Sequence, residues 1–376
     1  MLTKRHLWYN YFPVYSMRRF SLTQSIKVLL FAILLIAALY YGKPFLIPFV
    51  FAGILAMLLL PVVEWLEGKR LPKAIAVLCA VLLIVAAVAG IIGLISWQVA
   101  DLAKNASQLE SNIMQRVAQL KQFIANSLGL SLQEQQQMMQ KQQASSGISQ
   151  HVTGILTTTG GVITDFILML IYIFLFLYYR SQLHTFALKL VAKEKQEQTR
   201  DVLEKIEKTS RNYFTGLILM IACLWVMYGI GFSVVGAKNA IFFAILCGIL
   251  ELVPFVGNIT GTTLTVLVNV AQGANSGVLI GIIITYAIVQ FLQTYILEPL
   301  VVGDRVSINP LFTIAGIVAG ELIWGIPGMI LAIPLIGMTK IVCDNIESLQ
   351  PYGYLIGEEP KKNKKKGIKN PLTKRG

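Results

Sequence analysis

Charged side chains are scarce in this sequence. Only 14% of its 376 residues are Asp, Glu, Lys or Arg, whereas 55% are hydrophobic and the mean hydropathy is +0.66. Because about a quarter of the residues of a soluble domain are charged, this composition excludes an ordinary soluble globule. Alternating strands of about ten residues, which mark an outer-membrane barrel, are also missing from the sequence. The apolar runs are continuous instead, which predicts an all-α, polytopic membrane protein.

Residues that carry metal or nucleophilic chemistry are equally rare. The four cysteines lie far apart in apolar runs, and the three histidines lie outside those runs. No CxxC pair and no Cys/His spacing indicates a metal site. The sequence also lacks a P-loop pattern and any nucleophile–base constellation. We therefore expect no enzyme activity, no cofactor and no metal, and energy supplied by a gradient or by downhill flow.

Acidic residues are missing from both ends of the chain, which are strongly basic. Residues 1–27 carry five Lys or Arg and residues 361–376 carry eight, which accounts for the whole formal charge of +13. Basic segments beside membrane spans favour the cytoplasmic side and anionic lipid rather than nucleic acid. We expect both termini in the cytoplasm, membrane lipid as a partner, and no nucleic-acid partner.

The apolar runs and the breaks between them predict about seven to eight membrane segments. A break at Lys43-Pro44 divides the first run into 28–41 and 45–63, which form either a tight helical hairpin or one kinked unit. The predicted order is a basic N-terminus (1–27), membrane helices (28–97), an extramembrane helical insert (98–150), a membrane span (151–179), a charged cytoplasmic helix (180–211), a core (212–346) and a basic cytoplasmic tail (347–376).

Two apolar segments of the core are too long to be simple spans. Residues 240–271 and 311–342 would each form a helix of about 48 Å, against a hydrocarbon core of about 30 Å. Each is interrupted near its centre, at "PFVG" and at "GIPG". We therefore predict two broken, re-entrant helical hairpins of inverted topology. The first enters from outside, 277–297 crosses inward, and the second enters from inside.

Broken helices at membrane depth expose backbone polar groups, which must be buried in protein or line a wet cavity. Paired interrupted segments are also the best sequence pointer to a transporter's binding site. Spacings of three and four place most polar residues of the neighbouring span on one helical face. The candidate residues for substrate binding or coupling are Glu251, Pro254, Gly257, Asn258, Thr260, Gln290, Gln293, Thr294, Glu298, Glu321, Pro327 and Gly328.

The two glutamates of the hairpins are the main candidates for proton or ion coupling. Glu251 precedes the first break and Glu321 the second, in the similar stretches "GILELVPFVG" and "AGELIWGIPG". An ionisable group inside the membrane is a functional candidate by default. The other interpretation is structural, in which each neutral carboxyl caps backbone groups or joins helices.

Several of these stretches are similar to one family. "ELVPFVGNITG", "QFLQTYILEPLVVGDRVSINPLFTIAGIVAGELIWGIPGMILAIPLIGMTKIV" and the early "KPFLIPFV" resemble the autoinducer-2 exporter family of bacterial inner-membrane permeases. The resemblance implies a secondary transporter of the bacterial inner membrane, a homo-oligomer and an elevator-like moving part. One departure is Asn258, where the family's "P-x-x-G-P" often has a second proline.

The sequence and the resemblance together predict a permease that exports a small polar organic solute, with the autoinducer-2 signal as the named candidate. One alternative is a sodium/proton antiporter, which some relatives are. A second alternative is a non-transporting membrane scaffold that binds a partner through the 98–150 insert.

Overall fold

The computed structural model describes residues 22–104, 112, 115, 148–253, 256–302 and 308–358. Chain contacts divide the protein into two compact units, Met1–Lys43 and Pro44–Gly376. The first unit contains α1 (Leu22–Tyr41), an apolar helix with no buried side chain. The predicted break in the first apolar run lies at Gly42, where α1 has ended and α2 begins at Lys43. Both basic ends of the chain lie largely outside the described residues.

Helices make up almost all of the described chain, and no strand is found within it apart from one isolated bridge between Ile308 and Gly357. The helices of the N-terminal half are α2 (Lys43–Gly68), α3 (Lys73–Lys104), α6 (Ile148–Tyr178), α7 (Arg180–Lys189), the 3₁₀ turn η1 (Lys193–Lys195) and α8 (Gln196–Val234). Those of the C-terminal half are α9 (Ala240–Leu250), α10 (Val256–Ala271), α11 (Ser276–Leu292), the π-helix η2 (Gln293–Val302), α12 (Pro310–Trp324), α13 (Ile326–Asn345), the 3₁₀ turn η4 (Glu347–Leu349) and α14 (Gln350–Ile356).

The number of apolar helices agrees with a polytopic membrane protein. Among the described residues, six helices are long and apolar enough to cross a membrane, or up to seven when the bent pair α6–α7 counts as one span. α9 and α12 are apolar but shorter. At 11 and 15 residues they reach only about 16 and 22 Å, so neither crosses a hydrocarbon core of about 30 Å alone. The predicted all-α membrane fold is confirmed.

The charged segment 180–211, for which the sequence predicts one helix, consists of three pieces. α7 leaves α6 with a bend of 68° at Tyr179. The η1 turn follows, and α8 then continues without interruption from the charged segment to Val234. Two hydrogen bonds of 3.1 and 2.5 Å join Arg180 at the start of α7 to Glu67 at the end of α2. This paired contact fixes the bend against the loop between α2 and α3.

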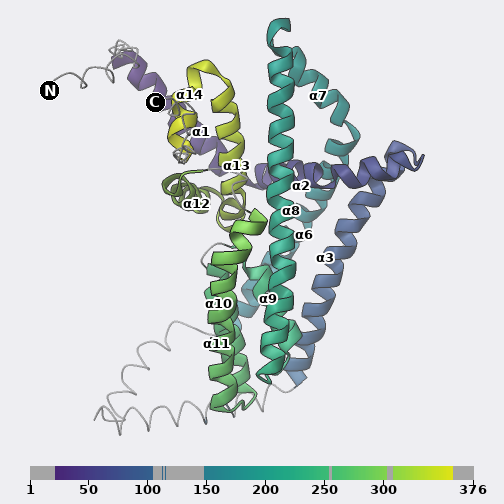
Figure 1. Cartoon of the computed structure of the whole chain (residues 1–376), viewed down its shortest axis with the longest axis vertical. Helices are drawn as coiled ribbons and strands as arrows, with labels where there is room; N and C mark the ends of the chain where they lie inside the picture. Colours follow the sequence, from purple (N-terminus) through teal and green to yellow (C-terminus); the bar gives the residue numbers. More distant parts are fainter. Residues whose placement is uncertain are drawn as a thin grey trace, which may run out of the picture. The chain divides into compact units, whose positions relative to one another are not determined.

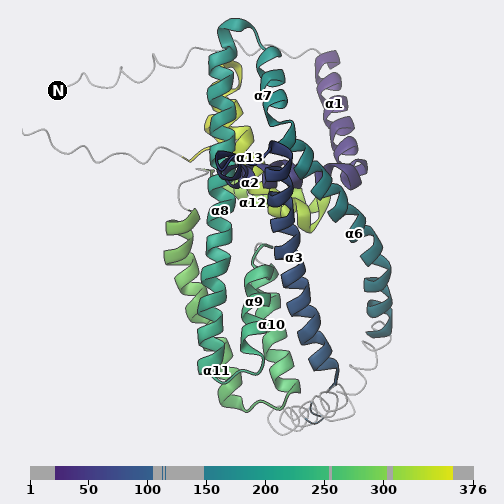
Figure 2. The same ribbon diagram turned by 90° about the vertical axis from the view of Figure 1, so that its right-hand side faces the viewer.

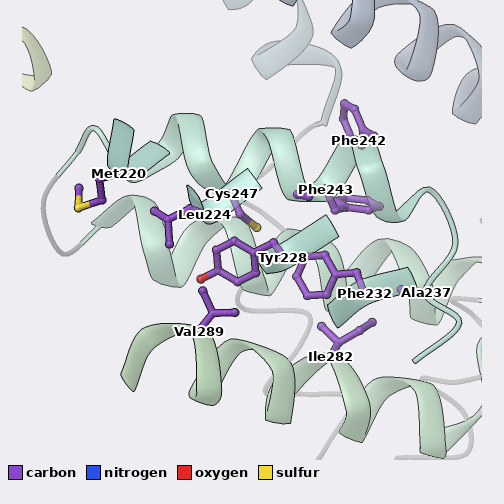
Figure 3. Close-up of a cluster of buried hydrophobic side chains, with 11 residues drawn as sticks. Met220, Leu224, Tyr228, Phe232, Ala237, Phe242, Phe243, Cys247, Ile282 and Val289 are labelled. Atoms are coloured by element: carbon purple, nitrogen blue, oxygen red, sulfur yellow. The ribbon is translucent and has the colours of Figure 1, made fainter. Parts of the chain in front are cut away.

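The first predicted hairpin packs along α8. Figures 1 and 2 show α9 and α10 side by side beside the lower part of α8, with α11 next to them. Their shared core is apolar and buried. In Figure 3, Tyr228 and Phe232 of α8 lie between Cys247 and Phe243 of α9 and the side chains of Val289 and Ile282 of α11. Burial of such a cluster stabilises the position of the hairpin against the two longer helices.

The polar ends of this hairpin are held by hydrogen bonds rather than by apolar contacts. The fully buried Asn269 accepts from the Lys238 backbone N–H at 2.9 Å and donates to the Thr265 carbonyl at 2.9 Å. Between α3 and α6, the structure describes two residues of the predicted insert, and Asn112 is one of them. Its side chain donates to the Ala271 carbonyl at 2.7 Å. The rest of the 98–150 insert, between the end of α3 and the start of α6, lies outside the described residues.

The second predicted hairpin has a tighter turn. α12 and α13 pack against each other, and Gly325 alone separates them with φ of 66°. That left-handed conformation favours glycine. A Cβ atom on Gly328 would overlap the Gly320 carbonyl oxygen, so the two helices approach at backbone distance. α13 in turn packs against α8 through a small core that includes Leu331 and Phe214.

Candidate functional site

The break in the first hairpin begins earlier than its proline. α9 ends at Leu250, and Glu251 is its C-cap residue rather than part of the helix interior. Leu252 and Val253 then form turns by donating to the carbonyls of Ile249 and Leu250. Pro254 lies outside the described residues. The residue before a proline disfavours the α-helical region, so helical geometry is disfavoured at Val253. Glu251 lies at the C-terminal end of α9.

Gly257 lets the chain return closely over the end of α9. Its N–H donates to the Val253 carbonyl at 3.0 Å. A Cβ atom at this position would overlap the Leu250 carbonyl oxygen. The geometry thus brings the backbone of Gly257 close to the end of α9, where only glycine fits.

Glu251 is paired across the hairpin with the neighbouring helix. The Gln293 side-chain nitrogen donates to Glu251 Oε1 at 2.6 Å. Gln293 is only 5% exposed, and its own Oε1 has no hydrogen-bond partner among the described residues. Glu251 Oε2 is likewise buried without a partner in the described part of the chain. The pair therefore leaves two oxygen acceptors unused in a buried place.

A second amide pair lies beside the first. Asn258, on the first turn of α10, donates through Nδ2 to Gln290 Oε1. Gln290 then donates to the Thr294 hydroxyl at 3.3 Å. Gln290 and Gln293 are three residues apart, so their side chains are neighbours on one helix surface. The sequence-predicted residues thus form two hydrogen-bonded groups at neighbouring positions, Glu251 with Gln293 and Asn258 with Gln290 and Thr294. We call these five residues the break cluster.

Burial divides the break cluster into an inner and an outer part. Glu251 Oε2, Gln293 and Asn258 are buried, whereas Gln290 is half-buried and Thr294 is exposed. Glu298 lies four residues beyond Thr294 and is also exposed. Thr260 lies on the exposed side of α10. The polar groups of the outer part face away from the packed helices. The inner part is enclosed by the helices.

The candidates of the second hairpin are arranged differently. Glu321 is exposed on α12, and its backbone carbonyl accepts from Gly325 at 2.7 Å. Pro327 stands in the first turn of α13, where proline is well tolerated. Gly328 makes the backbone contact with Gly320 described above. Among the described residues, no hydrogen bond joins Glu321, Pro327 or Gly328 to the break cluster. The two glutamates therefore have different environments, although the stretches around them are similar.

The sequence did not predict the π-helix that follows α11. It runs from Gln293 to Val302 and contains Pro299. A π-helical segment is wider than an α-helix and is frequent at functional sites. Here the π-helix starts at Gln293, whose side chain donates a hydrogen bond to the Glu251 carboxylate. Pro299 is the only local signal of this irregularity in the sequence.

The unpaired side-chain atoms that could contact a ligand at this site are oxygens. Among the described residues, no three His, Cys, Asp or Glu side chains gather as they would around a transition metal. Cys247 is buried one turn before Glu251, 3.7 Å from the Thr265 hydroxyl. The arrangement suits binding of a solute or ion by hydrogen bonds and oxygen contacts.

Comparison with known proteins agrees with this architecture. The family model described as AI-2E family transporter matches residues 29–348. "Putative transport protein YueF" of Bacillus subtilis is 27% identical over 315 residues, covering 80% of this chain and 84% of that protein. "Putative transport protein YrrI" of the same organism is 24% identical over 315 residues, covering 80% and 86%. A "Putative transport protein" of Haemophilus influenzae is 23% identical over 341 residues, covering 87% and 94%. The chain belongs to the AI-2E family of membrane transporters.

Proposed function

We propose that this transporter exports a small polar organic solute, with autoinducer-2 as the candidate, and that the solute contacts the outer part of the break cluster. One observation carries the proposal. Thr294 and Glu298 are exposed and Gln290 is half-buried along one side of α11 and η2, within an otherwise apolar segment. Polar groups in such a segment require a wet cavity or a polar ligand. Neutral hydroxyl and amide groups fit a hydrogen-bonding solute.

The contact is tested by replacing the outer polar groups with apolar side chains of similar shape. Gln290→Leu and Thr294→Val should each lower the flux of labelled autoinducer-2 into inverted vesicles by about tenfold, because one hydrogen bond to the solute is lost. Thr339→Val, at an exposed threonine of α13 outside the break cluster, is the matched control and should leave the flux unchanged. Normal flux in both cluster variants would show that the solute binds elsewhere.

The same vesicles separate the two alternatives that the sequence leaves open. A sodium gradient that changes the internal pH in the absence of any organic solute would favour a sodium/proton antiporter. Absence of every flux, combined with partner binding that depends on residues 98–150, would favour the scaffold.

We also propose a bacterial inner-membrane location with both termini in the cytoplasm and both hairpins re-entrant. The basic ends support this orientation, and the short α9 and α12 support the re-entrant hairpins. The family resemblance adds two further parts to the proposal, which are assembly into a homo-oligomer and an elevator-like movement.

Single cysteines in a chain without its four natural cysteines test the topology. Ser233, Ser276 and Ser348 are exposed near the end of α8, at the start of α11 and in η4. Cysteine at Ser233 and Ser276 should react with an impermeant maleimide from outside the cell. Cysteine at Ser348 should react only after the cytoplasmic side is opened. If Ser233 and Ser276 react from opposite sides, 240–271 is a full crossing and the re-entrant arrangement is wrong.

A further inference from the structure

An arginine occupies a turn position that favours glycine. Helix α2 ends at Gly68, and the chain turns at Arg70, whose φ of 67° is left-handed. The Arg70 N–H donates to the Glu67 carbonyl at 2.9 Å. The next N–H, that of Leu71, donates back to the Leu66 carbonyl at 3.4 Å. These two bonds form a Schellman ending, in which the left-handed residue is usually glycine. The arginine therefore occupies a strained backbone position although its side chain is exposed.

The loop between α2 and α3 contains three cations, at the corner where α2 ends and α3 begins (Figure 1). We call them the corner cations: Lys69, Arg70 and Lys73. The ion pairs found in the described part of the chain include none of them. Glu67, the nearest acid in sequence, is paired with Arg180, and only Lys73 also interacts with it electrostatically. Glu64 is exposed on α2 and is likewise outside these ion pairs. The corner therefore keeps an excess of positive charge.

Two of the corner cations lie over exposed aromatic rings. Lys69 Nζ is 3.7 Å from the centroid of the Trp65 ring, and Lys73 Nζ is 5.5 Å from the centroid of the Tyr178 ring. The two rings are 59% and 37% exposed. Exposed Trp and Tyr side chains are enriched where a membrane meets water. An ammonium group over a ring face keeps N–H donors that can still contact an anion.

The corner also lies at the end of two neighbouring membrane helices. α3 begins at Lys73, α6 ends at Tyr178, and the two helices pack against each other. α3 is long and apolar enough to span a membrane alone, and α6 is so together with α7. Their common end therefore lies at the membrane surface. The anions that are abundant at that depth are the phosphate groups of lipids.

We propose that the corner cations bind the headgroup phosphates of anionic phospholipid in the cytoplasmic leaflet. The choice of leaflet rests on the proposed orientation of the chain, whereas the preference for anionic lipid does not. This surface is separate from the basic ends of the chain and from the break cluster. Bound lipid holds the α2–α3 loop at the membrane surface. Through the pair of Glu67 with Arg180 it also holds the bend between α6 and α7. Lipid binding by the Arg70 side chain accounts for an arginine where glycine suits the backbone better.

Trp65 provides a local probe of this lipid. Full-length protein is placed in nanodiscs that contain phosphatidylglycerol or phosphatidylcholine with a nitroxide near the headgroup. The quenching that disappears in Trp65→Phe belongs to Trp65, so lipid bound by the basic ends does not contribute. Phosphatidylglycerol should quench Trp65 several times more strongly than phosphatidylcholine at the same mole fraction. Equal quenching by the two lipids would overturn the proposal. Competition by soluble glycerol phosphate at constant ionic strength would assign the surface to a free phosphate instead.

Arg70→Gly separates lipid binding from a structural role. Glycine adopts the left-handed conformation without strain, so the variant should unfold in detergent close to the wild-type temperature. Loss of one cation at an anionic surface should lower the preference for phosphatidylglycerol by about fivefold. Lys193→Gln, at an exposed lysine of η1, removes the same charge elsewhere and should leave the preference unchanged.

A folded Arg70→Gly protein with the full preference for phosphatidylglycerol would show that the proposal is wrong. If that variant fails to fold, the same measurement on Lys69→Gln decides, because its exposed side chain is not part of the turn's hydrogen bonds. Neither readout uses a transported solute, so failure of the proposed function would leave these results unaffected.

Discussion

Gly257→Ala and Gly328→Ala should each prevent stable closure of their hairpin. In both positions the new Cβ atom would overlap a backbone carbonyl oxygen, that of Leu250 for the first and that of Gly320 for the second. Backbone atoms cannot turn aside as the end of a flexible side chain can, so the packed helices must separate. Overpacking costs about 1–3 kcal/mol where side chains give way, and we expect at least the upper end here. Thermal unfolding in detergent and vesicle flux measure the effect.

Two glycines of α3 provide the matched control for these substitutions. A Cβ atom on Gly90 or Gly93 would meet nothing within 4 Å. Alanine is also the better helix former by about 1 kcal/mol. Gly90→Ala and Gly93→Ala should therefore unfold at or slightly above the wild-type temperature. If Gly257→Ala behaves in the same way, the close approach of α10 to the end of α9 is not required for stability.

Glu251→Gln should separate proton coupling from solute movement. The glutamine side chain keeps the size of the glutamate and can still accept from Gln293, but it cannot take up or release a proton. Proton-driven uphill transport of labelled autoinducer-2 should therefore lose its pH dependence, because the titrating carboxyl at this membrane position is gone. Exchange of labelled for unlabelled solute at equal pH on both sides should persist, since the outer part of the break cluster is intact.

Glu251→Leu is the informative companion of this variant. It leaves the Gln293 nitrogen buried without an acceptor, which costs about 1–3 kcal/mol. We therefore expect lower thermal stability and loss of both exchange and driven transport. A Glu251→Gln protein with full transport and an unchanged pH profile, measured beside a damaged Glu251→Leu protein, would assign Glu251 a purely structural role.

Much of the fold could be predicted because its signals are local. Long apolar runs determine which segments form membrane-length helices, since length and hydropathy need no partner. The two breaks follow from Pro and Gly, which act on the backbone of their own segment. The predicted hairpins, 240–271 and 311–342, agree closely with the outer bounds of α9–α10 (240–271) and α12–α13 (310–345). The predicted continuous helix over 180–211 differs, because the bend at Tyr179 and the η1 turn have no strong proline or glycine signal.

The sequence by itself determined the residue types of the site, and only the tertiary structure decided their pairing. Spacing placed Gln290 and Gln293 on one helical surface, but it could not show that Gln293 reaches Glu251 across 42 residues or that Gln290 reaches Asn258 across 32. The same limit applies to the two glutamates, whose local sequences are similar. Glu251 lies against the π-helix that starts at Gln293, whereas Glu321 is exposed on α12. Whether a carboxyl is buried and which acceptors remain unpaired depends on the helices packed around it, and those contacts are not encoded in its own segment.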